Sequence, residues 1–203
     1  MARLVGVLGG TFDPPHIGHR ILADEGRVAL GLDQVYWVLT PFPPHKRSRP
    51  ITPLNLRKKM LEEAIRRNAD FCFSNADIDR PQPHYSLGTM EWLSEHNPGV
   101  SFIYLMGSDS YQNLPTWYQP RKFLDTCAGL GVMLREGTEI DFKELEREIP
   151  GIQAKTHFFS APLISVSSLD IRRRVRNGEP YRYLVPCGVY NIIQEYGLYR
   201  EGN

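Results

Sequence analysis

Two histidines, His16 and His19, stand three positions apart in the segment GGTFDPPHIGH, which spans residues 9–19. At the start of a helix this spacing places both side chains on one face, beside backbone N–H groups that attract anions. Glycines ahead of the helix permit a tight turn and the close approach of a ligand. Gly18 leaves room between the two imidazoles. The segment therefore predicts an anion site, although it has neither the Gly-x-Gly-x-x-Gly nor the P-loop spacing.

A second candidate anion site lies far along the chain, in VSSLDIRRR at residues 166–174. Ser167 with Asp170 matches a Ser-x-x-Asp capping pattern, so a helix should begin here. Arg172 then falls close to the positive end of that helix, where a bound anion would offset the unfavourable charge. We interpret Arg173, Arg174 and Arg176 as a solvated basic face, screened by Asp170 and nearby glutamates.

Apolar runs typical of buried strands alternate with segments of helical periodicity. We expect strands at residues 4–8, 34–39, 71–73, 101–106, 128–134 and 156–160. We expect helices at residues 17–30, 54–67, 85–96, 118–125, 142–148, 169–176 and 186–196, with Pro186 at the first position of the last. In the first helix, Ile17, Ile21 and Val28 are expected on one apolar face.

The alternation predicts an α/β fold, a Rossmann-like doubly wound parallel sheet with helices on both faces and a C-terminal helical cap. We expect one domain, 1–203, in which residues 163–203 supply the second anion site and the closing helices. Ligands of such sheets bind beyond the carboxyl ends of the strands. The loops at Gly9, Thr40, Gly107 and Arg135 are therefore the expected site.

Composition excludes several classes of protein. Lys and Arg total 24 and Asp and Glu total 23, a net charge of +1 that argues against nucleic-acid or membrane-surface partners. No apolar run reaches the ~18 residues of a membrane span, and the first residues do not resemble a signal peptide. Cys72, Cys127 and Cys187 have no metal-binding spacing. We expect reduced thiols, no protein metal site and a cytoplasmic location.

The first segment resembles the signature of nucleotidylyltransferases related to class I aminoacyl-tRNA synthetases. The resemblance implies that His16 and His19 contact the triphosphate of a nucleotide and that Thr11 and Phe12 line it. The second segment is similar to that superfamily's Ile-Ser-Ser-Thr-x-Ile-Arg signature, with Leu169 in place of threonine. It implies that this helix start, with Arg172, holds the β- and γ-phosphates.

Four further segments resemble bacterial nicotinate-nucleotide adenylyltransferases: PPHK (43–46), PHYSLGT (83–89), FIYLMGSDSYQNLPTW (102–117) and the end of the chain, 184–199. The resemblance implies adenylyl transfer from ATP to nicotinate mononucleotide, with Mg²⁺ bridging the ATP phosphates mostly through water. The implied catalytic residues are His16, His19 and Arg172. The implied ATP site comprises Gly9, Gly10, Thr11, Phe12, His16, Gly18, His19, Gly107, Asp109, Ser167, Ser168 and Arg172. The implied mononucleotide site comprises Lys46, Tyr85, Ser86, Trp117 and Arg135.

Three of these residues each allow two interpretations. Trp117 either stacks on the pyridine ring or fills a satellite core. Asp109 either accepts from a ribose hydroxyl or caps a helix. Lys46 either pairs with the attacking phosphate or belongs to a solvated loop.

Several other activities remain open. A nicotinamide-mononucleotide or dual-specificity enzyme is the nearest alternative, because the two rings differ by one charge. Phosphopantetheine adenylyltransferases and cytidylyltransferases share the first loop, and tRNA synthetases share the His-x-Gly-His letters. A nucleotide sensor without catalysis would bind ATP and release no pyrophosphate. The sequence specifies no oligomeric state.

Overall fold

The computed structural model describes residues 3–43, 51–134 and 139–200. Its centre is a six-stranded parallel sheet in the order β3-β2-β1-β4-β5-β6. The strands are β1 (Arg3–Gly10), β2 (Gln34–Leu39), β3 (Phe71–Ser74), β4 (Val100–Gly107), β5 (Gly129–Met133) and β6 (Thr156–Phe159). Each begins and ends within two residues of its expected position, so the α/β doubly wound sheet is confirmed.

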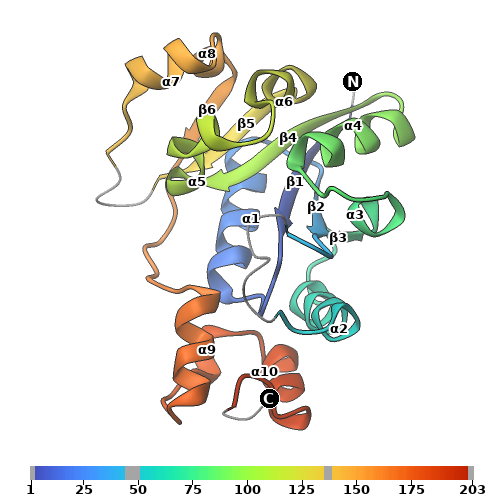
Figure 1. The fold of residues 1–203 in the computed structure, drawn as a ribbon, viewed down its shortest axis with the longest axis vertical. Helices are drawn as coiled ribbons and strands as arrows, with labels where there is room; N and C mark the ends of the chain where they lie inside the picture. Colours follow the sequence, from blue (N-terminus) through green and yellow to red (C-terminus); the bar gives the residue numbers. More distant parts are fainter. Residues whose placement is uncertain (1–2, 44–50, 135–138, 201–203) are drawn as a thin grey trace.

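Helices cover both faces of this sheet (Figure 1). The expected ones are α1 (Ile17–Ala29), α2 (Leu54–Ile65), α4 (Ser86–His96), α6 (Pro120–Thr126), α7 (Phe142–Glu148), α9 (Ser168–Arg176) and α10 (Cys187–Glu195). Short elements that the sequence did not predict are α3 (Ala76–Asp79), α5 (Ser108–Gln112), α8 (Ile152–Lys155) and the 3₁₀ turns η2 (Leu114–Thr116) and η3 (Arg182–Leu184). Elements of three to five residues are too short to carry a periodic pattern.

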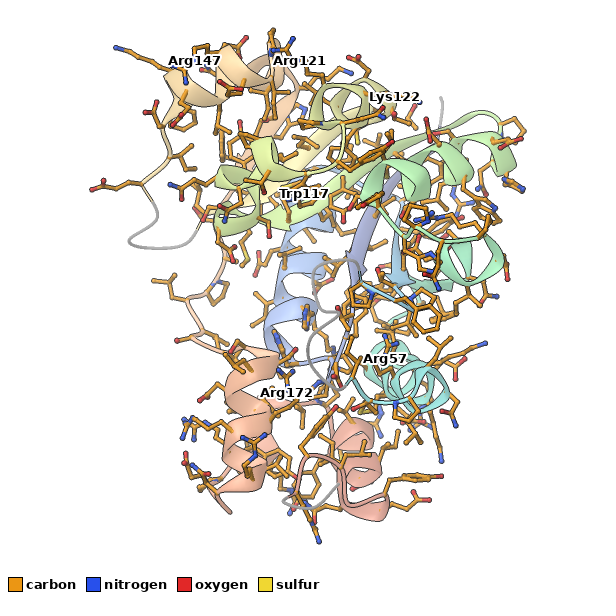
Figure 2. The ribbon with its side chains drawn as sticks, in the orientation of Figure 1. Arg57, Trp117, Arg121, Lys122, Arg147 and Arg172 are labelled. Atoms are coloured by element: carbon orange, nitrogen blue, oxygen red, sulfur yellow. The ribbon has the colours of Figure 1, made fainter. Side chains whose placement is uncertain are left out.

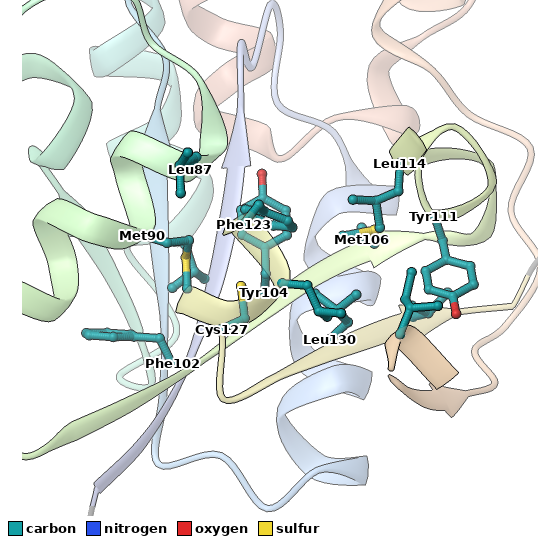
Figure 3. Close-up of a cluster of buried hydrophobic side chains, with 14 of the residues drawn as sticks. Leu87, Met90, Phe102, Tyr104, Met106, Tyr111, Leu114, Phe123, Cys127 and Leu130 are labelled. Carbon is teal, nitrogen blue, oxygen red and sulfur yellow. The ribbon is translucent and has the colours of Figure 1, made fainter. Parts of the chain in front are cut away.

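The core has three parts. On one face of the sheet, Met90 and Leu93 of α4 and Phe123 of α6 pack over β4 and β5. Figure 3 shows Met90 and Phe123 in this cluster. On the other face, side chains of α1 and α2 pack over β1 and β2. A third cluster joins α9 and α10 to the outer side of α2, so α2 lies between the sheet and the C-terminal helices.

Two details of the helices differ from expectation. The buried residues of α1 are Leu22, Ala23 and Gly26, whereas Val28 is 66% exposed. The expected face of Ile17, Ile21 and Val28 was wrong because the sheet covers the neighbouring side of the helix. Pro186 is the N-cap of α10 and not its first helical residue, because its backbone ψ of 148° is extended.

The strand order reverses at the centre of the sheet. Strand β1 pairs with β2 on one side and β4 on the other, so the connections that follow β1 and β4 diverge. Such a switch point opens a crevice beyond the carboxyl ends of the strands. Gly10 and Gly107 end these two strands, so each strand runs one or two residues beyond its predicted end.

The described part of the chain contains no helix with the length and apolar character needed to cross a bilayer. The three cysteines are free thiols, as expected. Burial raises the pKa of the Cys127 thiol to about 12, so this thiol is unreactive at neutral pH.

One buried cation ties together the loops at the crevice. Arg57 of α2 is 2% exposed and donates to the carbonyl oxygens of Thr11 (3.0 Å), Thr40 (2.9 Å), Pro41 (2.7 Å) and Thr52 (2.8 Å). These carbonyls belong to the loops after β1 and β2 and to the segment before α2. Burial lowers the pKa of Arg57, and the charge of Asp13 opposes this shift. The planar five-donor guanidinium suits such a cluster of acceptors.

Replacing Arg57 with Met keeps a long side chain but leaves four carbonyl oxygens without their donor. We expect the free energy of unfolding to fall by about 3 kcal/mol. Urea unfolding followed by circular dichroism measures it. The control is Arg66→Met, which removes an arginine that is 63% exposed in its side chain and pairs with Glu63. That variant should unfold like the parent, and equal losses in both would contradict the role of Arg57.

Candidate active site

The loop after β1 is built around Phe12. This residue has a left-handed φ of 47° and is 2% exposed. Its ring meets His19 edge-on at 5.0 Å and lies 5.4 Å from the ring of Trp37. A Cβ on Gly10 would approach the Phe12 ring to 3.1 Å, so a glycine allows the chain to fold back over it. The loop therefore presents backbone to the crevice and hides its aromatic side chain.

The two predicted histidines lie together at the start of α1. Their rings stack with centroids 3.6 Å apart, and His16 is the N-cap of the helix. The backbone N–H of His16 donates to Nδ1 of His19 at 3.1 Å. Because Nδ1 of His19 accepts, the proton of its neutral ring belongs on Nε2, which makes Nε2 a donor. The predicted shared face is confirmed.

Gly18 allows two distant segments to meet. A Cβ at this position would stand 2.9 Å from Cγ1 of Val166 and 3.1 Å from Nδ1 of His16. The room that the sequence analysis expected between the imidazoles is therefore taken up by the His16 ring and by Val166, in the segment before α9.

The second predicted site meets the first loop directly. Oγ of Ser168 donates to the carbonyl of Pro14 at 2.8 Å, and Nη1 of Arg172 donates to the carbonyl of Asp13 at 2.6 Å. Figure 2 shows Arg172 at the boundary between α9 and the region below the sheet. From the sequence we expected a bound anion to offset the charge of Arg172. In the structure, the backbone carbonyl of Asp13 already accepts a hydrogen bond from this side chain.

The start of α9 forms half of the expected capping box. Oγ of Ser167 accepts from the backbone N–H of Asp170 at 3.1 Å. The Asp170 carboxylate instead accepts from Arg173 and Arg174, both at 2.7 Å, and these hydrogen bonds lower its pKa. Arg173 also pairs with Glu179. The interpretation of Arg173 and Arg174 as a screened face is thus confirmed.

Beside these elements lies a cavity of about 430 Å³. Its walls come from α1, the end of β5, the segment before α9 and the start of α9. They comprise Gly18, Ile21, Met133, Leu134, Ala161, Pro162, Leu163, Ile164, Ser165, Val166, Ser167 and Asp170. We call it the large cavity. The sequence analysis named none of residues 161–164 as a site residue, because this segment carries neither a periodic pattern nor a polar motif.

A second, smaller cavity is lined in part by the end of β1 and by Thr11, the first residue of the loop that follows it (residues 11–16, the β1 loop). Its lining comprises Gly9, Gly10, Thr11, Thr40, Pro43, His84, Tyr85, Ser86, Leu87, Tyr104, Trp117 and Tyr118. We call it the small cavity. It brings together Tyr85, Ser86 and Trp117, the described members of the predicted mononucleotide site. Trp117 packs on the core beside Tyr104 and Phe123, as one of its two interpretations predicts, and it also lines this cavity. Its stacking on a pyridine ring stays a prediction.

A buried ion pair shapes the wall that carries Ser86. Asp77 is 2% exposed and accepts from Thr40 (3.1 Å), Arg80 (3.0 Å) and Thr89 (2.7 Å). Arg80 also donates to the carbonyls of Pro83 (2.9 Å) and Tyr85 (3.0 Å). The sequence analysis missed both residues, since an Asp and an Arg three apart are usually an exposed pair.

The end of the chain also reaches the first loop. The hydroxyl of Tyr199 donates to Oδ1 of Asp13 at 2.7 Å, and the N–H of Thr52 donates to Oδ2 at 3.4 Å. Burial and the charge of Asp13 raise the pKa of Tyr199 far above its usual range. The sequence analysis singled out residues 184–199 for their resemblance to a family segment, but no sequence pattern predicted that Tyr199 contacts Asp13.

The remaining predicted residues are more remote. Asp109 is exposed in the first turn of α5, and Gly107 is the N-cap of that helix, so the capping interpretation of Asp109 was wrong. Neither residue lines the two cavities. Lys46 and Arg135 lie outside the described residues.

The sequence profile of the cytidylyltransferase-like family matches residues 7–174. A probable nicotinate-nucleotide adenylyltransferase of Thermomicrobium roseum is 40% identical over 200 residues, which are 98% of this chain and 92% of that one. The corresponding protein of Exiguobacterium sibiricum is 36% identical over 195 residues, 96% of this chain and 98% of its own.

Among solved structures, the Plasmodium falciparum nicotinic acid mononucleotide adenylyltransferase complexed with NaAD superposes with a TM-score of 0.78. It is 18% identical and covers 97% of both chains. At this identity the likeness establishes the fold. The near-complete alignments with the bacterial proteins establish more: this chain belongs to the nicotinate-nucleotide adenylyltransferase family, within the wider cytidylyltransferase-like family.

Proposed function

We propose that this chain transfers the adenylyl group of ATP to nicotinate mononucleotide, forming nicotinate adenine dinucleotide and pyrophosphate in NAD biosynthesis. The observation that carries the proposal is the position of the β1 loop. The end of β1 and Thr11, the first residue of this loop, line the small cavity, and Gly18, just after the loop, lines the large cavity. The stacked His16–His19 pair and the start of α9 adjoin the loop. A reaction that joins two nucleotides requires two such subsites that meet at one phosphate-binding loop.

The large cavity suits the adenosine of ATP. Its walls include Ile21, Met133 and Val166, whose apolar side chains match a purine face. The triphosphate would then run past the N-terminus of α1, towards His16, His19 and the start of α9. The free N–H groups of the helix N-termini favour negative charge at this point.

The small cavity suits the pyridine ring of the mononucleotide. Trp117, Tyr85 and Tyr118 supply flat apolar surfaces, and the rings of Tyr85 and Tyr118 stack at 4.5 Å. Ser86 is the first residue of α4, so a ring carboxylate beside it would meet both a hydroxyl and helix-start N–H groups. We propose Lys46 and Arg135 as partners of the attacking phosphate.

The chemistry needs charge neutralisation more than proton transfer. A phosphate monoester has a second pKa of about 6, so the nucleophile is largely dianionic at neutral pH. It attacks the α-phosphorus of ATP, and the bond to the β-phosphate oxygen breaks to release pyrophosphate. His16 and His19 would stabilise the charge that develops on the transferred phosphoryl group, with Nε2–H of His19 as a donor. Arg172 would hold the departing pyrophosphate.

Magnesium fits this scheme as part of the MgATP substrate. The described residues contain no group of three or more His, Cys, Asp or Glu side chains that could cage a metal ion. Asp13, the acidic residue of the loop, is instead engaged by Tyr199 and Thr52. The ion would therefore be held by phosphate oxygens and water, the ligand set that Mg²⁺ prefers at nucleotides.

The direct test is pyrophosphate release from MgATP with nicotinate mononucleotide, nicotinamide mononucleotide or phosphopantetheine as the acceptor. We expect turnover with nicotinate mononucleotide and a clear preference for it. Comparable rates with both pyridine nucleotides would establish a dual-specificity enzyme. Turnover with phosphopantetheine alone would reject the acceptor assignment, and ATP binding without release from any acceptor would establish a sensor.

Replacing His19 with Ala should lower kcat by about 100-fold or more, since it removes a donor to charge that develops in the transition state. Circular dichroism should be unchanged. His96→Ala is the control, because His96 lies at the end of α4 and stacks on Trp92 away from both cavities. If His19→Ala kept turnover within a few-fold of the parent, the assigned role would be wrong.

Arg172→Gln should reduce kcat/KM for ATP by about 10- to 100-fold, because a charged donor to the pyrophosphate is lost. The neighbouring Arg173→Gln removes the same charge from a side chain held by Asp170 and Glu179. Steady-state kinetics of the two variants should therefore differ. Equal losses of kcat/KM in both variants would indicate that the positive charge of the helix face acts at a distance, and that Arg172 makes no direct contact with the pyrophosphate.

A further inference from the structure

Tyr104 of β4 combines a core ring with a hydroxyl at the small cavity. The residue is 6% exposed, and its ring packs edge-to-face on Phe123 at 5.1 Å and on Trp117 at 5.9 Å. Figure 3 shows it among the buried side chains that cover this face of the sheet. A phenylalanine would fill the same space. The hydroxyl therefore calls for a separate explanation.

Two neighbours are fitted to that hydroxyl. Oγ of Ser86 lies 3.3 Å from it, within hydrogen-bond distance. On the opposite side, a Cβ on Gly9 would stand only 2.8 Å from the Tyr104 oxygen, so the glycine leaves space for it. The hydroxyl thus lies close to both the end of β1 and the start of α4. Burial raises the pKa of Tyr104 to about 12, which keeps the group protonated at neutral pH.

The direction of this hydrogen bond depends on what Ser86 faces. Each hydroxyl carries one proton, so only one of the two donates in the pair. When an anion occupies the cavity, the Ser86 proton is best placed on that anion. Ser86 must then accept from Tyr104. The arrangement becomes a chain in which Tyr104 donates to Ser86 and Ser86 donates to the ligand, and each bond polarises the next.

A second observation also points to a polar ligand group in this cavity. His84 lines it and is 7% exposed, and within the described residues its Nδ1 has no hydrogen-bond partner. Burial lowers the pKa of His84, which favours the neutral imidazole. A buried polar atom without a partner is costly unless a ligand or water satisfies it.

We propose that Tyr104 is a positioning residue that fixes the proton of Ser86 towards the ligand and thereby favours a carboxylate over a carboxamide on the pyridine ring. This inference rests on the proposed function. A carboxylate accepts a charge-assisted hydrogen bond from Ser86, which is stronger than a bond between neutral groups. The carbonyl oxygen of a carboxamide can also accept from Ser86, but that bond joins two neutral groups and is weaker.

The test is Tyr104→Phe, assayed with nicotinate and nicotinamide mononucleotides. We expect KM for the nicotinate substrate to rise about five- to tenfold, the equivalent of one hydrogen bond between neutral groups, with kcat unchanged. KM for the nicotinamide substrate should stay nearly constant, so the preference for the acid falls. Ser86→Ala should lose the same preference for the nicotinate substrate. The double variant should show little further loss of this preference, because both residues act through one hydrogen-bonded chain.

Tyr111→Phe is the matched control. Tyr111 is another buried tyrosine, but its hydroxyl accepts from Oγ1 of Thr156 at 3.2 Å, away from both cavities. The Tyr111→Phe variant should leave the ratio of the KM values for the two substrates unchanged. If Tyr104 had a purely structural role, Tyr104→Phe would change the KM values for both substrates alike and would lower the unfolding midpoint. Thermal unfolding of each variant measures that midpoint.

Three outcomes separate the possibilities. An unchanged acid-to-amide ratio in Tyr104→Phe overturns the inference, as does full acid preference in Ser86→Ala, whatever the stability of the Tyr104 variant. If the parent protein itself uses neither pyridine mononucleotide, the proposed function fails instead, before any variant is compared.

Discussion

The crevice depends on the burial of one positive charge. Loops that pass close to a protein interior carry carbonyl groups that need donors, and water cannot supply them there. Arg57 supplies them for the loops after β1 and β2 and for the segment before α2. Its contact with the carbonyl of Thr11 fixes the residue just before Phe12, where the backbone turns left-handed. The shape of the β1 loop is therefore set from α2 and not from the loop alone.

The C-terminal helices complete the same loop from the other side. Arg172 and Ser168 bind the carbonyls of Asp13 and Pro14, and Tyr199 binds the carboxylate of Asp13. Gly18 permits this approach, because any larger side chain would collide with Val166. The two candidate anion sites therefore form a single region only when α9 and the tail dock. Docking is driven by the apolar cluster that α9 and α10 share with α2.

The two cavities differ in how they are made. The large cavity has mainly apolar walls, which suit a base held by its face. The small cavity places hydroxyls and an imidazole beside aromatic rings, with Asp77 and Arg80 bracing the wall behind them. Polar groups that are held by a second layer of hydrogen bonds keep one geometry, which is what recognition of a small charged substituent requires.

The sequence by itself determined the alternation of strands and helices, because strands buried on both faces need continuous apolar runs. It also determined the first loop and the start of α9, since glycine turns and a serine cap act over a few residues. Tertiary structure decided which side of α1 is buried, the roles of Arg57 and Asp77, and the contacts of Tyr104 and Tyr199. Their partners lie on other elements, up to 186 residues away for Tyr199 and Asp13, and no local pattern encodes such a distance.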